Sequence, residues 1–342
     1  MDKKLILAVA GSGKTTEIIN KINFNDKTII VTYTDNNYNN IKDRIIKKFK
    51  NIPPNIRIYT YFTFLYKFCF APIKKNLETK GIEYTQIRNR YLSANNLNYY
   101  MNLKSKKMYH SRLAKLCNEK FIKDIQNRLE KFFDNIYIDE IQDFSGHDFN
   151  FVLNMIKCNC NIFLVGDFYQ HTYDTSRDGS VNKNLYSSYD AYIDMFKKNN
   201  PDLLIDSTEF LKSKRCSKEV CLFIKDHLEI NIESFFEHSS QVIEVQGKTE
   251  IEKIVNSDNI IKLFYQNSKK YNINKADNWG NSKGSTFENV CIVLNEKSYK
   301  LYKMNKLFDL PIITKNKLYV ACSRPTKNLY IVNEKEIKDY LK

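Results

Sequence analysis

The stretch Ala8-Val9-Ala10-Gly11-Ser12-Gly13-Lys14-Thr15-Thr16 lies near the amino terminus and indicates a fold built around a phosphate-binding loop. It follows a short apolar run and precedes a segment that is predicted to be helical from about Gly13. Glycines let backbone N–H groups turn toward phosphates, and a helix N-terminus adds partial positive charge. In this pattern the lysine reaches the β- and γ-phosphates, and the next hydroxyl ligates Mg²⁺. We therefore expect residues 10–16 to bind nucleotide phosphates, with Lys14 on the phosphates and Thr15 on the metal.

Short apolar segments recur along the chain, with helix-like segments between them. Each is predicted to be a buried strand because it is short, apolar and often β-branched. The segments are residues 5–9, 28–32, 56–60, 136–138, 162–165, 241–245, 290–294, 317–322 and 329–332. Their alternation with helices is typical of parallel sheets covered by helices, which makes this an α/β protein. The polar stretch 71–129 breaks the alternation and is predicted to be a helical insertion.

A chain of 342 residues is long enough for two domains. We predict a first domain from residues 1–70 and 130–200, interrupted by the insertion, and a second domain from residues 201–342. The formal net charge of +15 has two interpretations. It follows from a composition that is rich in lysine, or it marks a polyanionic partner such as nucleic acid.

Several classes of protein are disfavoured by the remaining composition. No run of about 18 apolar residues occurs, so no membrane span is expected. The apolar run near the start is too short for a signal peptide. Of the eight cysteines, only Cys158 and Cys160 lie close together, and no second pair has the spacing of metal ligands. We expect reduced thiols and a cytoplasmic location.

A second segment supplies the acidic residues that a phosphate-binding loop requires. The apolar run Ile136-Tyr137-Ile138 ends in Asp139 and Glu140. A carboxylate at the end of a neighbouring strand holds the metal ion in such proteins. We expect Asp139 to bind Mg²⁺ and Glu140 to act as general base on the attacking water.

The continuation Asp139-Glu140-Ile141-Gln142-Asp143 resembles the same segment of superfamily I DNA helicases of the UvrD/Rep type. Further segments similar to that family follow in the expected order, and the loop that begins with Ala8 is also of that family's form. These segments are Val31-Thr32-Tyr33-Thr34-Asp35, Tyr59-Thr60-Tyr61-Phe62-Thr63-Phe64, Leu164-Val165-Gly166-Asp167-Phe168-Tyr169-Gln170, Ser213-Lys214-Arg215-Cys216-Ser217, Ser282-Lys283-Gly284-Ser285-Thr286-Phe287 and Leu318-Tyr319-Val320-Ala321-Cys322-Ser323-Arg324. The resemblance implies two RecA-like parallel-sheet P-loop domains.

The resemblance also implies a catalytic set and its cofactors, ATP and Mg²⁺. Gln170 would sense the γ-phosphate. Arg215 and Arg324 would neutralise the charge that develops on the γ-phosphoryl oxygens, together with Lys14 and the metal. Glu140 completes this set as the general base. The segment that ends in Arg324 is expected to be a strand.

Nucleic-acid contacts are expected where cations can meet phosphates and flat side chains can meet bases. The candidates in the matching segments are Tyr33, Phe62, Phe64, Tyr173 and Arg177. Tyrosine and phenylalanine are frequent in this chain, with 23 and 22 copies, so each ring also has an interpretation as an ordinary core or surface residue.

Two departures from the family pattern shape the functional prediction. The few residues before Ala8 leave no room for the family's adenine-reading segment, so nucleotide selectivity stays open. The stretch between Arg215 and Lys283 is too short for the subdomain that larger relatives insert there.

We predict an ATP-dependent translocase or helicase on single-stranded DNA, with hydrolysis stimulated by DNA. The alternative is a nucleotide- and DNA-gated regulator of a partner protein, such as a nuclease in a bacterial defence system.

Overall fold

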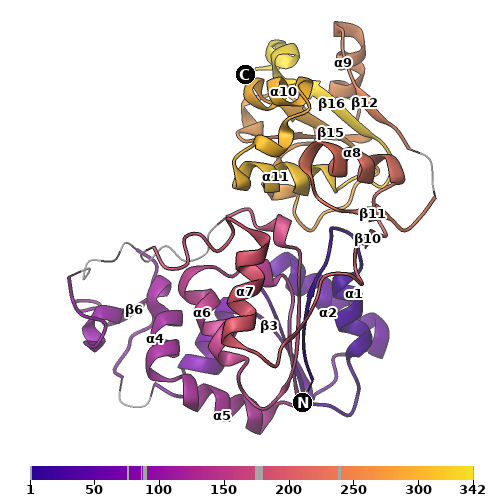
Figure 1. Ribbon diagram of the computed structural model, residues 1–342. Coiled ribbons are helices and arrows are strands. Elements are labelled where there is room, and N and C mark those ends of the chain that lie inside the picture. Colours follow the sequence, from indigo (N-terminus) through magenta and orange to yellow (C-terminus); the bar gives the residue numbers. More distant parts are fainter. Residues whose placement is uncertain are drawn as a thin grey trace. The chain divides into compact units, whose positions relative to one another are not determined.

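Two parallel sheets, each covered by helices, organise this chain (Figure 1). The computed structural model describes residues 2–74, 77–85, 87, 91–173, 180–237 and 240–341. The chain divides into two compact units. The first comprises Met1–Leu5, Thr15–Val165 and Asp174–Ile205, and the second comprises Ile6–Lys14, Gly166–Tyr173 and Asp206–Lys342.

The first sheet has six strands in the order β3-β2-β7-β8-β1-β9. The pairs β2–β3, β2–β7 and β7–β8 are parallel. The strands are β1 (Lys3–Leu7), β2 (Thr28–Thr32), β3 (Ile56–Thr60), β7 (Asn135–Ile138), β8 (Asn161–Gly166) and β9 (Leu204–Asp206). Figure 1 shows α1 (Lys14–Lys21) and α2 (Asp35–Phe49) on one side of this sheet, and α6 (Gly146–Met155) and α7 (Tyr189–Asn199) on the other. The predicted α/β class is confirmed.

Local sequence explains where α2 begins and ends. All five residues of β2 are buried, which fits their apolar and β-branched character. The chain then turns at Thr34, whose hydroxyl accepts a hydrogen bond from the backbone N–H of Asn37 and caps α2. The helix ends at Lys50, which has a φ of +67°. This cap fixes the segment between β2 and α2 at the carboxyl edge of the sheet.

The stretch 71–129 was expected to be helical, and the structure differs from this expectation. It contains a three-stranded sheet in the order β4-β6-β5, formed by β4 (Ile82–Glu83), β5 (Met101–Asn102) and β6 (Lys107–Tyr109). Helices α4 (Leu113–Lys120) and α5 (Ile122–Phe132) follow, and α5 extends past the predicted boundary. Strands of two or three residues are too short to produce a readable alternation of apolar and polar positions.

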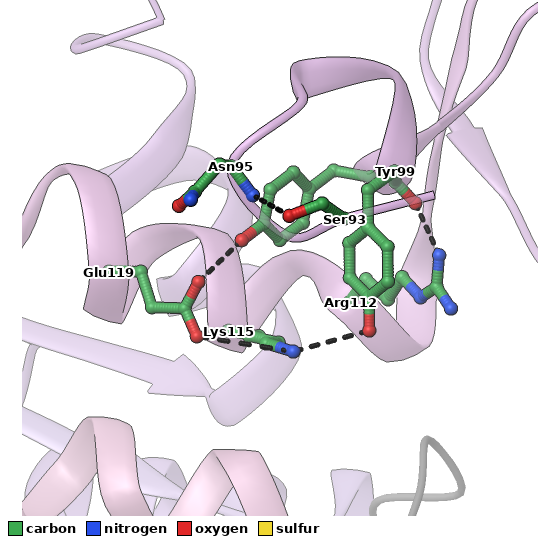
Figure 2. A network of polar contacts seen from close by, with 7 residues as sticks. Ser93, Asn95, Tyr99, Arg112, Lys115 and Glu119 are labelled. Carbon is green, nitrogen blue, oxygen red and sulfur yellow. Dashed lines mark hydrogen bonds and ion pairs between the residues drawn. The ribbon is translucent and has the colours of Figure 1, made fainter. Parts of the chain in front are cut away.

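A network of polar contacts ties this segment together (Figure 2). The guanidinium of Arg112 lies 3.4 Å from the centre of the Tyr99 ring and also donates to the Tyr99 carbonyl oxygen. Lys115 donates to the Tyr99 hydroxyl at 3.2 Å, and Tyr100 donates to Glu119 at 2.6 Å. Arg112 is only 2% exposed, so these contacts stabilise its buried positive charge.

The second unit contains a parallel sheet in the order β12-β16-β15-β13-β14. Its strands are β12 (Val242–Glu244), β13 (Ile260–Phe264), β14 (Ala276–Asn278), β15 (Asn289–Leu294) and β16 (Leu329–Asn333), and its helices are α8 (Lys218–Leu228), α9 (Lys248–Asn256), α10 (Glu296–Lys303) and α11 (Ile312–Cys322). Strands β10 (Lys212–Ser213) and β11 (Glu233–Ser234) form a separate short parallel pair in the same unit.

Alternating residues of β15 enter two different apolar clusters, as the two-residue period of a strand requires. Val290, Ile292 and Leu294 pack in one cluster with residues of α8 and α11. Cys291 and Val293 pack in the other cluster with residues of α9. Both faces of this sheet are therefore covered.

The prediction of a strand at residues 317–322 is wrong. These residues form the last turns of α11, which begins after Pro311. Most of the α11 residues from Asn316 onward are buried, so the helix has no polar stripe there. A short apolar run of this kind cannot be distinguished from a buried strand by its periodicity.

No helix among the described residues is long and apolar enough to cross a membrane.

Candidate nucleotide and nucleic-acid site

The phosphate loop groups with the second unit, which differs from the predicted domain boundaries. Its backbone explains why. The N–H of Val9 donates to the carbonyl oxygen of Phe210, and the N–H of Lys214 donates to that of Gly11. The N–H of Ala10 donates to the hydroxyl of Tyr319 at 2.9 Å. The loop is therefore held by hydrogen bonds to segments from residue 206 onward, although β1 leads into it.

The residues of the loop fit a bound phosphate group. The side-chain oxygen of Ser12 is buried and has no hydrogen-bond partner among the described residues, which is costly unless a ligand supplies one. Gly11 and Gly13 have φ angles of +72° and +100°, which favour glycine. Lys14 is 9% exposed, and its Nζ donates to the carbonyl oxygen of Val9 at 2.9 Å. Its ammonium group therefore lies on the loop that is predicted to bind phosphates.

Replacing Gly11 by alanine is expected to abolish nucleotide binding and to lower the free energy of unfolding by about 1–3 kcal/mol. A Cβ atom there would lie 2.7 Å from both the Cβ of Arg215 and the Oγ of Ser213. Gly247→Ala is the matched control, because its φ is +86° and no atom of the described residues lies within 4 Å of an added Cβ. Fluorescent-nucleotide titration and urea unfolding would measure both effects. Wild-type nucleotide affinity in Gly11→Ala would contradict the account of the loop.

A series of hydrogen bonds leads from the loop to Arg324. The Tyr319 hydroxyl, which accepts from the loop at Ala10, donates to the Asp167 carboxylate at 3.0 Å. The same carboxylate oxygen accepts from the Gln170 amide at 2.8 Å. The Gln170 carbonyl oxygen in turn faces the Arg324 guanidinium at 3.5 Å. Burial and the Asp167 carboxylate raise the pKa of Tyr319, so its hydroxyl keeps its proton and can donate. The structure thus brings predicted residues Ala10, Gln170 and Arg324 into one network.

Arg215 and Lys283 contact this network from neighbouring segments. Arg215 donates to the carbonyl oxygen of Ser323 at 3.1 Å. Lys283 donates to the backbone carbonyl oxygen of Gln170 at 3.1 Å. Arg215, Lys283 and Arg324 therefore place three cationic side chains in or beside this network.

The first unit holds the residues that were predicted to bind the metal and to act as the base. The Thr15 hydroxyl donates to Oδ2 of Asp139 at 3.0 Å. Asp139 is 1% exposed, and its Oδ1 accepts from the backbone N–H of Glu140. A hydroxyl and a carboxylate in contact are oxygen ligands of the kind Mg²⁺ prefers, so the pair fits that ion. Thr16 faces α2 instead, where its hydroxyl accepts from Arg44 at 2.8 Å.

Glu140 is held in a strained conformation between two amide groups. Its φ is +58°, in the left-handed region that non-glycine residues rarely adopt. Its carboxylate oxygens accept from Asn37 at 3.4 Å and from Gln142 at 2.5 Å. Such strain is often found at functional sites, where the surrounding structure maintains it. Sequence reasoning did not identify Asn37 as a partner, because it comes from a helix distant in the sequence.

Two of the aromatic residues that were predicted to contact nucleic acid line one cavity in the first unit. Tyr33 and Phe62 lie at the carboxyl ends of β2 and β3, beside a cavity of about 340 Å³. Tyr173 belongs to the second unit and is 44% exposed. Arg177 lies outside the described residues.

Phe64 is not available as a surface for a base, and this prediction is corrected. Its side chain is 1% exposed and packs against Tyr59 and Phe68. It begins a π-helical segment, Phe64–Phe70, in which five of seven residues are buried. The aromatic run from Tyr59 to Phe64 has no sequence pattern that distinguishes the buried Phe64 ring from the Phe62 ring, which lines the cavity.

The Phe64→Ala variant is expected to lower the free energy of unfolding by about 3–5 kcal/mol, since it leaves a cavity in the core. The matched control is Phe24→Ala, because the Phe24 side chain is 57% exposed. Urea denaturation would measure the difference. A loss below about 1 kcal/mol would show that the Phe64 ring is not in a packed core.

Comparisons with known proteins give a family and a fold for this chain. Residues 85–333 match the family model of the viral superfamily 1 RNA helicase core domain. No curated protein matches the sequence. Two solved structures of arterivirus nonstructural protein 10 (helicase), one of them in complex with DNA, are similar over 99% of this chain. Their sequence identities are 12% and 13%, with TM-scores of 0.51 and 0.50. This chain spans 62% and 63% of their lengths, and at such identities the likeness concerns the fold.

Proposed function

We propose that this chain, which belongs to the viral superfamily 1 RNA helicase core domain family, hydrolyses nucleoside triphosphates to move along a single strand of nucleic acid. The observation that best supports this proposal is the series of hydrogen bonds from the phosphate loop through Tyr319 and Asp167 to Gln170 and Arg324. Such a series makes the position of Arg324 depend on the state of the loop. Membership of superfamily 1 agrees with the sequence prediction, and the UvrD/Rep type is retained only as the source of the DNA hypothesis.

Phosphoryl transfer requires cations around the γ-phosphoryl group, and we propose ATP as the nucleotide. The buried hydroxyl of Ser12 and the ammonium group of Lys14 would bind the phosphates. Arg215 and Arg324 would stabilise the negative charge that develops during hydrolysis. Thr15 and Asp139 would hold Mg²⁺, which neutralises phosphate charge when it is bound.

Glu140 is proposed to accept the proton of the attacking water. A general base must be oriented toward the water as well as ionised. The contacts from Asn37 and Gln142 support this role, because both amides donate to the carboxylate and neither can take up a proton. They would hold the ionised form in a single orientation.

The nucleic acid is proposed to be single-stranded. The net charge of +15 supports a polyanionic partner. The sequence resemblance favours DNA, whereas the matching family is described for RNA helicases. The regulatory alternative, in which the chain gates a partner nuclease, receives no support from these comparisons, since the relatives that they give are helicases.

The test is steady-state hydrolysis of ATP, GTP, CTP and UTP, each with and without oligodeoxythymidylate or oligouridylate. We expect hydrolysis to rise by at least about tenfold with one of the two strands, since the charge-neutralising residues act only when correctly placed. The ratio between the two strands decides between DNA and RNA. Hydrolysis that no strand stimulates would contradict the proposal.

A further inference from the structure

The phosphate loop contacts the segment that follows β10, and both belong to the second unit. The backbone N–H of Lys214 donates to the carbonyl oxygen of Gly11 at 2.8 Å. The Lys214 ammonium lies 3.8 Å from the position that a Cβ atom on Gly13 would occupy. A lysine ammonium group therefore lies next to a glycine of the loop, where it can meet the phosphates of a bound nucleotide.

The same ammonium group also lies over an exposed aromatic ring. Nζ of Lys214 is 5.4 Å from the centre of the Phe235 ring. The Phe235 side chain is 55% exposed, and the ring of Phe236 lies 5.0 Å from it at an angle of 82°. Lys214 therefore connects the phosphate loop with a ring that presents an open apolar surface.

The position of the Phe235 ring is set by the short strands β10 and β11 (Figure 1). They run parallel, with Ser213 opposite Ser234, so their carboxyl ends lie together. Lys214 follows β10 and Phe235 follows β11, and the N–H of Phe235 donates to the carbonyl oxygen of Ser213 at 2.9 Å. The Ser234 hydroxyl donates to the carbonyl oxygen of Cys216 at 2.9 Å. Hydrogen bonds therefore fix the ring relative to the phosphate loop.

A nucleoside triphosphate is the ligand whose chemistry matches this arrangement. Its phosphates are anionic, and its base, which the ribose joins to them, is flat. The chain offers a cation at the loop and then an exposed ring, in the same order. The buried Oγ of Ser12, which has no hydrogen-bond partner among the described residues, independently indicates a ligand at the loop. An aromatic side chain stacks with any base, because every base has a π-face.

We propose that the Phe235 ring is the surface on which the base of the bound nucleoside triphosphate stacks. The proposal rests on the proposed function, since it assumes that the phosphate loop binds a nucleoside triphosphate. A phenylalanine ring has no hydrogen-bonding atom, so it does not distinguish adenine from guanine. Purines have two fused rings and cover more of the surface than pyrimidines do. We therefore expect ATP and GTP to bind with similar affinity, and CTP and UTP to bind more weakly.

The test is equilibrium calorimetry of the full chain with the Mg²⁺ complexes of ATP, GTP, CTP and ribose 5-triphosphate, which lacks only the base. In the unmodified protein, we expect ribose 5-triphosphate to bind about tenfold more weakly than ATP, since stacking of one base contributes on that order. The Phe235→Ala variant should bind ATP and GTP about tenfold more weakly and ribose 5-triphosphate within about twofold of the unmodified protein. The Phe235→Tyr variant keeps an aromatic ring and should retain the affinity for ATP.

Phe24→Ala is the matched control, because the Phe24 side chain is 57% exposed and belongs to the first unit. It should change neither affinity. A purely structural role of Phe235 would weaken ATP and ribose 5-triphosphate by the same factor. The ratio between these two ligands therefore separates stacking on the base from support of the loop.

Four results would overturn the inference. Unchanged ATP affinity in Phe235→Ala, in a protein whose hydrolysis a strand stimulates, would overturn it and leave the proposed function intact. An equal loss of affinity for ATP and for ribose 5-triphosphate would also overturn it. Equal binding of these two ligands by the unmodified protein would do the same, and this comparison needs no variant that folds. No binding of any triphosphate to the unmodified protein would overturn both the inference and the proposed function.

Discussion

Replacing Glu140 by glutamine is expected to lower the kcat of nucleic-acid-stimulated NTP hydrolysis by about 10²–10⁴-fold and to leave nucleotide and oligonucleotide affinities within about threefold. Glutamine has nearly the same shape as glutamate but cannot take up a proton from water. The amides of Asn37 and Gln142, which donate to the carboxylate, each also carry a carbonyl oxygen that can accept from the new amino group, so we expect the side chain to keep its place.

The measurement pairs steady-state hydrolysis at saturating oligonucleotide with equilibrium titrations of nucleotide and strand. Glu252→Gln serves as the control, because it makes the same chemical change at an exposed position on α9. Turnover in Glu140→Gln within a few fold of the wild type would show that another group accepts the proton.

The second large effect is expected for Arg324→Lys, which should reduce kcat by about 10³-fold. The Arg324 side chain is 1% exposed, and its guanidinium donates to backbone oxygens of Val320 and Ser285 as well as facing Gln170. Lysine carries the charge but cannot reproduce this fork of donors. The loss of these buried contacts should also lower the free energy of unfolding by about 1–3 kcal/mol.

Arg57→Lys, an exposed position on β3, is the control for the same substitution. Stopped-flow or steady-state hydrolysis gives kcat, and urea denaturation gives the stability at the assay temperature. A variant that is folded under assay conditions and hydrolyses at the wild-type rate would remove Arg324 from the catalytic set.

Strong local patterns allowed much of the first unit to be predicted from sequence. The strands at Thr28–Thr32 and Ile56–Thr60 have the predicted bounds, because each is a short β-branched run with polar residues at both ends. The phosphate loop and the Asp139-Glu140 pair were recognised by residue types that this chemistry requires in a fixed order. The structure brings Thr15 and Asp139, each predicted to bind Mg²⁺, into contact, since carboxyl ends of parallel strands meet at one edge of a sheet.

Features of the structure that depend on tertiary contacts could not be predicted from the sequence. The segment from Lys317 to Cys322 is helical, but residues 318–322 are all buried, which removes the stripe of polar residues that marks most helices. Tyr319 could not be assigned to the network, since its role depends on Ala10 and Asp167, both more than 100 residues away. Phe62 and Phe64 differ only in which way they face, and a helical segment rather than a strand sets that difference.

The central claim is that hydrolysis drives movement along a single strand, and displacement of streptavidin from end-biotinylated oligonucleotides tests it most directly. With ATP and Mg²⁺, we expect streptavidin to leave one end of the strand much faster than the other, and Glu140→Gln to displace none above the rate without protein. Displacement that is equally slow at both ends and independent of ATP, in a preparation whose hydrolysis the same strand stimulates, would contradict the claim.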